Sequence, residues 1–157
     1  MRGSISSVLG LSVVEMLVVL ALLGLALGGV AHWIVSRAHA AATAQDLVRH
    51  VTYTRWSAVS AGTPKTLVFV DTPPGIAEID GVFACDPVGL LGRHRWRPPR
   101  GTLVRWPIMG LAFAPDGLPR RCDGSAVGNT TILIEGPRGD RAAVIVASLG
   151  RVRWERR

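Results

Sequence analysis

The sequence predicts an α+β protein in which one long N-terminal helix packs on a small antiparallel β domain. Three observations predict this class. An uncharged apolar run covers residues 16–35, an amphipathic helical pattern follows it, and short apolar or alternating runs separated by glycine and proline cover the rest. A chain of 157 residues has room for one compact domain and an added segment, but not for two ordinary domains.

The apolar run at residues 16–35 contains no formally charged side chain. As a helix it would extend about 30 Å at roughly 1.5 Å per residue, which is the thickness of the hydrocarbon core of a bilayer. We therefore expect residues 11–36 to form the membrane-spanning half of the helix. A secretory signal peptide is the alternative, because alanines at positions 38 and 40–42 resemble a small-residue cleavage site.

The amphipathic pattern begins after residue 35. Ala44, Leu47, Val48 and Val51 follow helical spacing, with polar residues between them. We expect residues 37–62 to form the amphipathic half of the same helix. The helix would run from about residue 12 to about residue 61, because glycine and proline at positions 62 and 64 end a helix.

Residues 63–157 contain the short runs typical of β-strands. Turn formers such as Pro73-Pro74-Gly75 and Asp116-Gly117 separate them. The expected strands are residues 66–70, 76–79, 102–106, 111–114, 131–135, 142–147 and 151–154. Their apolar sides would pack against the amphipathic half of the helix, because one apolar helix face needs a second layer to cover it.

The positive charge of the chain is carried almost wholly by arginine, and the formal net charge is +7. Residues 90–105 contain no acidic residue, and we expect a flexible basic loop there with Arg93, Arg95 and Arg97 as candidate contacts to DNA. Guanidinium groups suit phosphate partners. The alternative is a compositional bias of the coding sequence without a binding role.

Cys85 and Cys122 are the two cysteines of the chain, and both follow the apolar run. In an oxidising compartment they can form a disulfide, which would contribute roughly 4 kcal/mol for a loop of this size. Two separate buried thiols are the alternative, because the sequence does not show bridge geometry.

The start of the apolar run carries the most specific motif. Gly10 is followed five residues later by Glu15, at the edge of the expected membrane span, where an ionised carboxylate costs on the order of 3 kcal/mol without a partner. This arrangement resembles the prepilin motif of type IV pilins and pseudopilins. The resemblance implies that residues 1–10 are a leader, that a peptidase cuts after Gly10, and that the new terminal amine of Leu11 is methylated. Glu15 would then pair with the terminal ammonium of a neighbouring subunit during filament assembly.

The motif departs from the usual family pattern in three positions. Leu11 stands where phenylalanine is common, Ser12 replaces threonine and Val13 replaces leucine. Each substitution keeps the apolar or small hydroxyl character of the position.

A second resemblance, to the minor pilins and pseudopilins grouped as FimT and GspH, lies in the β region. Residues 113–117 resemble their F-x-x-D-G turn, and residues 150–153 resemble their terminal G-R-x-R. The family implies the pilin fold, with residues 63–157 as a β-sandwich-like head on the long helix. In the FimT branch the terminal motif contacts DNA during natural transformation. Carried over, Arg151 and Arg153 are candidate DNA contacts, with Arg156 and Arg157 extending the patch.

Strand geometry agrees with a DNA contact at Arg151 and Arg153. Residues two apart on a strand share a face and stand about 7 Å apart, comparable to successive phosphates on one nucleic-acid strand. The alternative is that these charges protect an exposed sheet edge from aggregation. Trp96 and Trp154 could stack on bases or could pack within the protein.

The family resemblance leaves three functions open. The chain could be a minor pilin that binds DNA, a GspH-like structural pseudopilin of a type II secretion system that binds none, or a subunit that primes pilus assembly. Expected partners are a prepilin peptidase, other pilins or pseudopilins, the inner membrane before assembly, and DNA. The expected location is the inner (cytoplasmic) membrane, single-pass, with the head outside the cytoplasm, and afterwards the pilus or pseudopilus.

Catalytic motifs are missing from the sequence. It has no zinc-type cysteine and histidine spacing, no G-x-S-x-G elbow and no Walker phosphate loop. We therefore expect no enzymatic activity, no catalytic residues, no cofactor and no metal site.

Overall fold

The computed structural model describes residues 13–36, 39–71, 73–85 and 94–157, and for residues 28–36, 94 and 95 it describes the backbone alone. The predicted leader at 1–10, the processing residues Gly10 and Leu11, and the candidate Arg93 lie outside these residues. The chain divides after Ser36 into two compact units, residues 1–36 and residues 37–157.

Two helices take the place of the single long helix that the sequence predicted. They are α1 (Val13–Ser36) and α2 (His39–Ala61). The amide nitrogen of Ala40 donates a hydrogen bond of 2.7 Å to the Asp140 carboxylate. In a continuous helix this amide would bond to the carbonyl of residue 36, so α2 begins as a separately capped helix. The expectation of one long helix, and of the pilin fold built on it, was wrong.

The transmembrane expectation was also wrong. Among the helices of the described residues, none is both long and apolar enough to cross a membrane. This finding contradicts the single-pass placement in the inner membrane.

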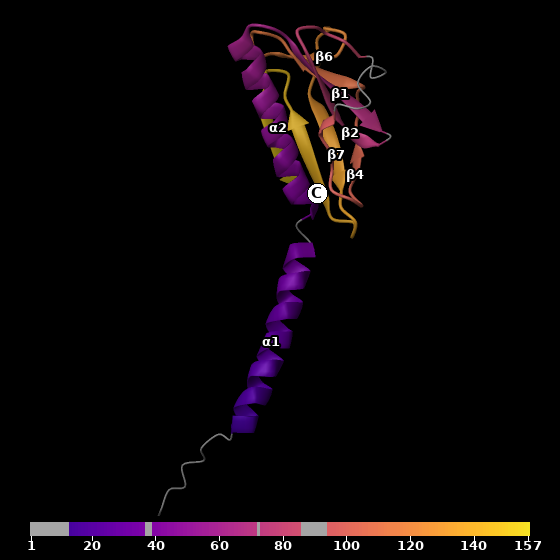
Figure 1. Ribbon diagram of the computed structural model, residues 1–157. Helices are drawn as coiled ribbons and strands as arrows, with labels where there is room; N and C mark the ends of the chain where they lie inside the picture. The colour runs from indigo at the N-terminus through magenta and orange to yellow at the C-terminus, as the bar shows by residue number, and fades with distance from the viewer. Residues whose placement is uncertain (1–12, 37–38, 72, 86–93) are drawn as a thin grey trace, which may run out of the picture. The chain divides into compact units, whose positions relative to one another are not determined.

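Helix α2 packs on the β-strands through one face (Figure 1). Its buried residues recur every three or four positions, as a helix face requires, and lie chiefly against β8 and β9, whose bounds follow. They are Ala40, Ala41, Thr43, Ala44, Leu47, Val51, Thr54 and Ala58. The amphipathic pattern in the sequence therefore marks the face that covers the core.

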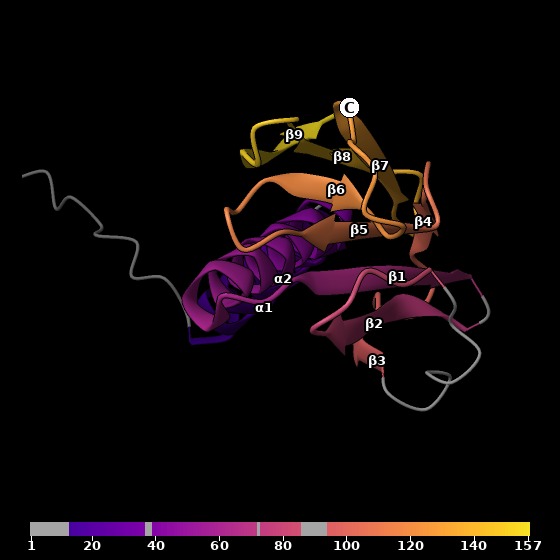
Figure 2. The same cartoon turned by 90° about the horizontal axis from the view of Figure 1, so that it is seen from above.

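The β region forms two antiparallel sheets, which Figure 2 shows from above. The five-stranded sheet has the order β3-β2-β1-β5-β6, and the four-stranded sheet has the order β4-β7-β8-β9. The bounds are β1 (Lys65–Asp71), β2 (Pro74–Asp80), β3 (His94–Trp96), β4 (Leu103–Arg105), β5 (Gly110–Phe113), β6 (Pro119–Arg121), β7 (Thr130–Glu135), β8 (Arg141–Val146) and β9 (Val152–Arg156).

All seven expected strands are found, with ends shifted by at most two residues. Strands β3 and β6 were not predicted. Part of the expected basic loop is strand β3, in which Trp96 is buried and its indole Nε1 donates a hydrogen bond of 2.7 Å to Asp46 of α2. The flexible-loop expectation was therefore wrong for residues 94–96, and Trp96 packs inside the protein.

The core lies where α2 meets the inner faces of both sheets. Leu47, Leu67, Phe113 and Ile132 are fully buried there. At one side the Phe69 and Trp106 rings stack with centroids 4.3 Å apart, and Trp96 meets Trp106 edge to face. This single core makes residues 37–157 an independently packed unit.

Cys85 and Cys122 form a disulfide, which confirms the pairing that the sequence left open. It joins the segment after β2 to the residue that follows β6. In the adjoining turn, hydrogen bonds from Ser125 lower the pKa of Asp123 below its usual value.

Candidate nucleic-acid interface

The four-stranded sheet has an inner face toward the core and an outer face away from it. On β8, Ala142, Val144 and Val146 are buried among the core residues. The residues between them, and their cross-strand partners, point the other way because side chains alternate along a strand. We call this second surface the outer face.

Arg151 and Arg153 lie side by side on the outer face. Arg153 pairs with Ile145 of β8, and the Ala147 amide donates a hydrogen bond of 2.9 Å to the Arg151 carbonyl. Both arginines are exposed and line one depression of about 210 Å³, together with Asn129, Ile145 and Ala147. The guanidinium groups of this pair are therefore available to a ligand on the outer face.

The two remaining terminal arginines point in opposite directions. Arg156 pairs with Ala142, whose side chain is buried on the inner face, so Arg156 leaves the sheet on that side. The backbone amide of Arg157 donates to the Arg141 carbonyl, and its side chain lies on the outer face. Arg157 extends the patch of Arg151 and Arg153, and Arg156 does not.

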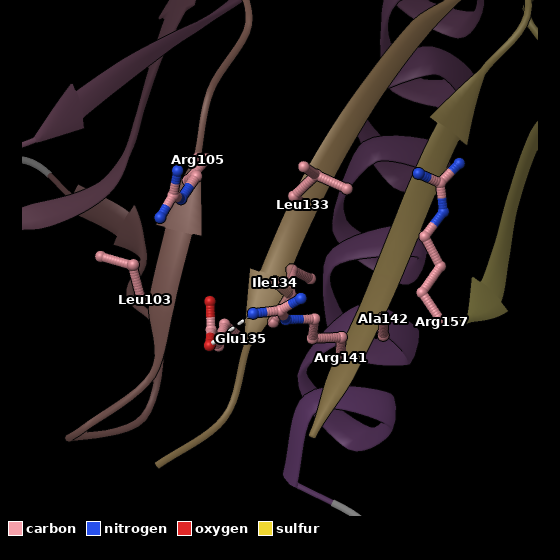
Figure 3. Close-up of a pocket in the computed structure, with 8 residues that line it drawn as sticks. All are labelled: Leu103, Arg105, Leu133, Ile134, Glu135, Arg141, Ala142 and Arg157. Carbon is pink, nitrogen blue, oxygen red and sulfur yellow. Dashed lines mark hydrogen bonds and ion pairs between the residues drawn. The ribbon is translucent and has the colours of Figure 1, made fainter. Parts of the chain in front are cut away.

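A second depression, of about 340 Å³, lies toward the opposite end of the outer face (Figure 3). Three arginines from three strand ends surround it: Arg105 of β4, Arg141 of β8 and Arg157 after β9. In Figure 3 Arg105 and Arg157 lie on either side of Leu133. The remaining lining residues are Leu103, Ile134, Glu135 and Ala142.

Sequence reasoning did not identify Arg105 and Arg141 as members of this surface. Each is an exposed residue at the end of a strand, and strand alternation alone would place it on one of two faces. Only the strand order β4-β7-β8-β9 shows that both share a face with Arg153.

Two glutamates offset part of the positive charge of the outer face. Arg141 bonds to Glu135 at 3.3 Å, and Arg157 bonds to Glu155 at 3.1 Å. Arg105, Arg151 and Arg153 have no carboxylate within ion-pair distance in the described part of the chain. Among the described residues, five arginines and two glutamates leave three positive charges on this face.

No protein-family model, curated protein or solved structure matches this chain. Its function must therefore be inferred from the outer face and from α1.

The other predicted DNA contacts lie elsewhere. Arg97 is exposed directly after β3, which belongs to the five-stranded sheet. Arg93 lies outside the described residues, and so does the side chain of Arg95. The structure therefore brings together Arg151, Arg153 and Arg157 of the predicted set, and it does not bring Arg97 to them.

The turn that leads into β9 is held in place from the helix. Arg55 of α2 donates from Nε to the Gly117 carbonyl and from Nη1 to the Gly150 carbonyl, each at 3.0 Å. Gly117 and Gly150 belong to the two β-region motifs that resemble the FimT and GspH proteins. Arg55 thus fixes the backbone immediately before Arg151.

Glu15, the predicted assembly residue, lies in the first turn of α1 with its side chain exposed. A carboxylate in that turn is favourable because the N-terminal end of a helix carries partial positive charge. In the described part of the chain, no three histidine, cysteine or acidic residues gather in a way that could hold a metal ion.

Proposed function

We propose that this chain is a minor pilin-like subunit that binds DNA through the outer face of its four-stranded sheet, in DNA uptake for natural transformation. The observation that carries the proposal is the placement of Arg151 and Arg153. They are exposed, lie side by side over one depression, and have no carboxylate partner among the described residues.

The charge of the outer face suits a polyanion. Arginines that neutralise phosphates release condensed counterions, so binding is strong at low salt and weakens as salt rises. The outer face offers guanidinium groups from β4, from β8, and from β9 with its flanking residues, at Arg105, Arg141, Arg151, Arg153 and Arg157. Contacts of this kind do not read sequence, as uptake of unrelated DNA requires.

The pilin-like assembly in this proposal is supported by α1. Its described side chains, residues 13–27, are all exposed, including Val13 at 75% and Leu25 at 75%. An apolar helix surface of this extent is unfavourable in water by about 25 cal/mol per Å², so it needs a covering partner. In the proposed filament, neighbouring subunits cover it after cleavage behind Gly10, and Glu15 pairs with the amine of Leu11. N-terminal sequencing of the mature protein tests the cleavage, and any start other than Leu11 contradicts it.

A DNA titration tests the proposed binding. We would compare the full-length chain with the double variant Arg151→Gln/Arg153→Gln, and with Arg100→Gln/Arg121→Gln as a charge-matched control. The control arginines are exposed and lie away from β9, after β3 and in β6. The first variant should weaken binding, and the slope of log K against log salt should fall by about two, roughly one for each phosphate that is no longer neutralised.

The control should reduce binding far less. Equal losses in the two double variants would show that only net charge matters, and absence of binding at low salt would remove the DNA proposal.

A structural pseudopilin of a type II secretion system is the second candidate. It is favoured by the position of β9 at a sheet edge, where exposed charges hinder pairing with another chain. It is also favoured by Glu135 and Glu155, which form ion pairs with two of the five outer-face arginines. For this candidate, the titration would show no binding at low salt, whereas crosslinking through residues 13–27 would still yield subunit pairs.

A further inference from the structure

We propose that the depression between Arg105 and Arg157 is a nucleobase subsite, so that the outer face takes single-stranded DNA in preference to duplex. This inference rests on the proposed DNA binding and deepens it by naming the form of DNA.

The floor of this depression is apolar. Leu103 is 51% exposed and Leu133 is 40% exposed, and they come from the adjacent strands β4 and β7. The register pairs Leu103 with Glu135 and Arg105 with Leu133, so the two leucines are diagonal neighbours on the outer face. Apolar surface of this kind gains nothing from a phosphate but gains from the flat face of a base.

The rim of the depression adds groups that suit a base. The guanidinium of Arg105 lies on one side of Leu133, and Arg141 and Arg157 lie on the other side (Figure 3). Guanidinium planes stack on bases as well as binding phosphate. The volume of about 340 Å³ lies in the lower part of the range of about 300–1,000 Å³ for small-molecule sites.

Glu135 distinguishes this depression from the one at Arg151 and Arg153. Its carboxylate lines the depression and bonds to Arg141 at 3.3 Å. This carboxylate weakens the attraction of the surrounding arginines for a phosphate, whereas the exocyclic amino group of a base can donate a hydrogen bond to it. No carboxylate of the described residues lines the depression at Arg151 and Arg153, which is therefore the phosphate end of the same surface.

The two depressions are spaced for one continuous strand of nucleic acid. Arg153 and Arg157 are four residues apart along an extended segment, or about 14 Å at roughly 3.4 Å per residue. An extended single strand bridges this separation within a few nucleotides and can turn a base toward Leu103 and Leu133. In duplex DNA the bases are stacked and paired, and extruding one costs a few kcal/mol. Duplex is therefore limited to the arginine contacts.

The experiment compares single-stranded and duplex oligonucleotides of equal length by fluorescence anisotropy. The test variant is Leu103→Ala/Leu133→Ala in the full-length chain. The control is Val82→Ala/Met109→Ala, which removes two side chains that are 52% and 67% exposed away from the outer face. The test variant should bind single strands about tenfold more weakly and duplex within about twofold of wild type. The control should leave both affinities unchanged.

A single strand without bases provides a second measurement that does not depend on substitutions. Wild type should bind an abasic strand no better than the leucine variant binds the normal strand. Equal binding of normal and abasic strands, or equal losses on single strands and duplex, would overturn the nucleobase subsite and leave DNA binding intact. Absence of binding to every oligonucleotide would overturn both proposals.

Discussion

Gly150 packs so closely on Gly117 that a Cβ atom on Gly150 would lie 2.8 Å from the Gly117 carbonyl oxygen. Gly150 has a φ of +82°, and Gly117 has a φ of +77°. The turn that closes β5 onto β6 and the turn that leads into β9 therefore touch directly. With Arg55 bonded to both carbonyls, helix α2 and these two turns form one support for Arg151.

Gly150→Ala should destabilise the protein more than Gly139→Ala does. Gly139 also has a positive φ, of +79°, but a Cβ atom there would have open space within 4 Å, so alanine costs only about 1–2 kcal/mol of backbone strain. At Gly150 the close oxygen adds about 1–3 kcal/mol of overpacking. Urea unfolding measures both variants, and equal destabilisation would show that the two turns tolerate a wider separation.

Arg55→Met should reduce the free energy of unfolding by about 2–3 kcal/mol, because two carbonyls would no longer accept from a charged donor. Arg49→Met is the matched control, since Arg49 is exposed on the same helix. If Arg55 also positions Arg151, the folded variant should bind DNA more weakly than the Arg49 variant does. Equal stability of the two variants would mean that the hydrogen bonds of Arg55 contribute nothing net.

Removal of the disulfide by Cys85→Ser/Cys122→Ser should destabilise the protein by about 2–4 kcal/mol. The residues are 37 apart in sequence, and a closed loop of this length restricts the unfolded chain substantially. Thermal unfolding with and without a reducing agent measures the effect. Wild type should lose stability on reduction, while the double serine variant should not respond. A reductant effect on the variant would show that the loss arises elsewhere.

Asp46→Ala should cost about 1–3 kcal/mol, because the indole Nε1 of buried Trp96 would be left without its acceptor. Asp46→Asn keeps an acceptor oxygen and should restore most of the stability. Gln45→Ala, at an exposed neighbour on α2, is the control. Denaturant unfolding followed by tryptophan fluorescence reports on this contact, and a neutral Asp46→Ala would show that Trp96 does not need the bond.

Strand positions were the most predictable part of the fold. Alternation between positions such as Ile132 and Ile134, and turn formers such as Asp116-Gly117, are local signals, and they located seven strands. Strand β3 was missed because it is three residues long and lies in an arginine-rich segment. The start of α2 was missed because its capping carboxylate, Asp140, is 100 residues away in sequence.

Only the part of the candidate site that lies on one strand was predictable, because side chains alternate between the two faces along a strand. Arg151 and Arg153 share a face, as their spacing indicates, and the same spacing selects Arg157 and not Arg156. Grouping Arg156 with them ignored that rule. The convergence of Arg105 and Arg141 depends on strand order, which is set by the packing of distant segments and leaves no local signal.

Glu155→Gln should strengthen DNA binding roughly two- to fivefold at low salt. Glu155 lies between Arg153 and Arg157 on the outer face, where its charge repels phosphate and also engages the Arg157 guanidinium at 3.1 Å. Removing the charge lowers the repulsion and frees Arg157, and an interaction of one charge pair at a solvated surface is on the order of 1 kcal/mol. The gain should shrink as salt is added, because salt screens exposed charges.

Asp123→Asn, at an exposed turn away from this sheet, removes the same charge and should leave the affinity nearly unchanged. If both variants gain DNA affinity equally, binding responds to net charge and the outer face has no special role. If only Glu155→Gln gains affinity, the DNA passes over β9.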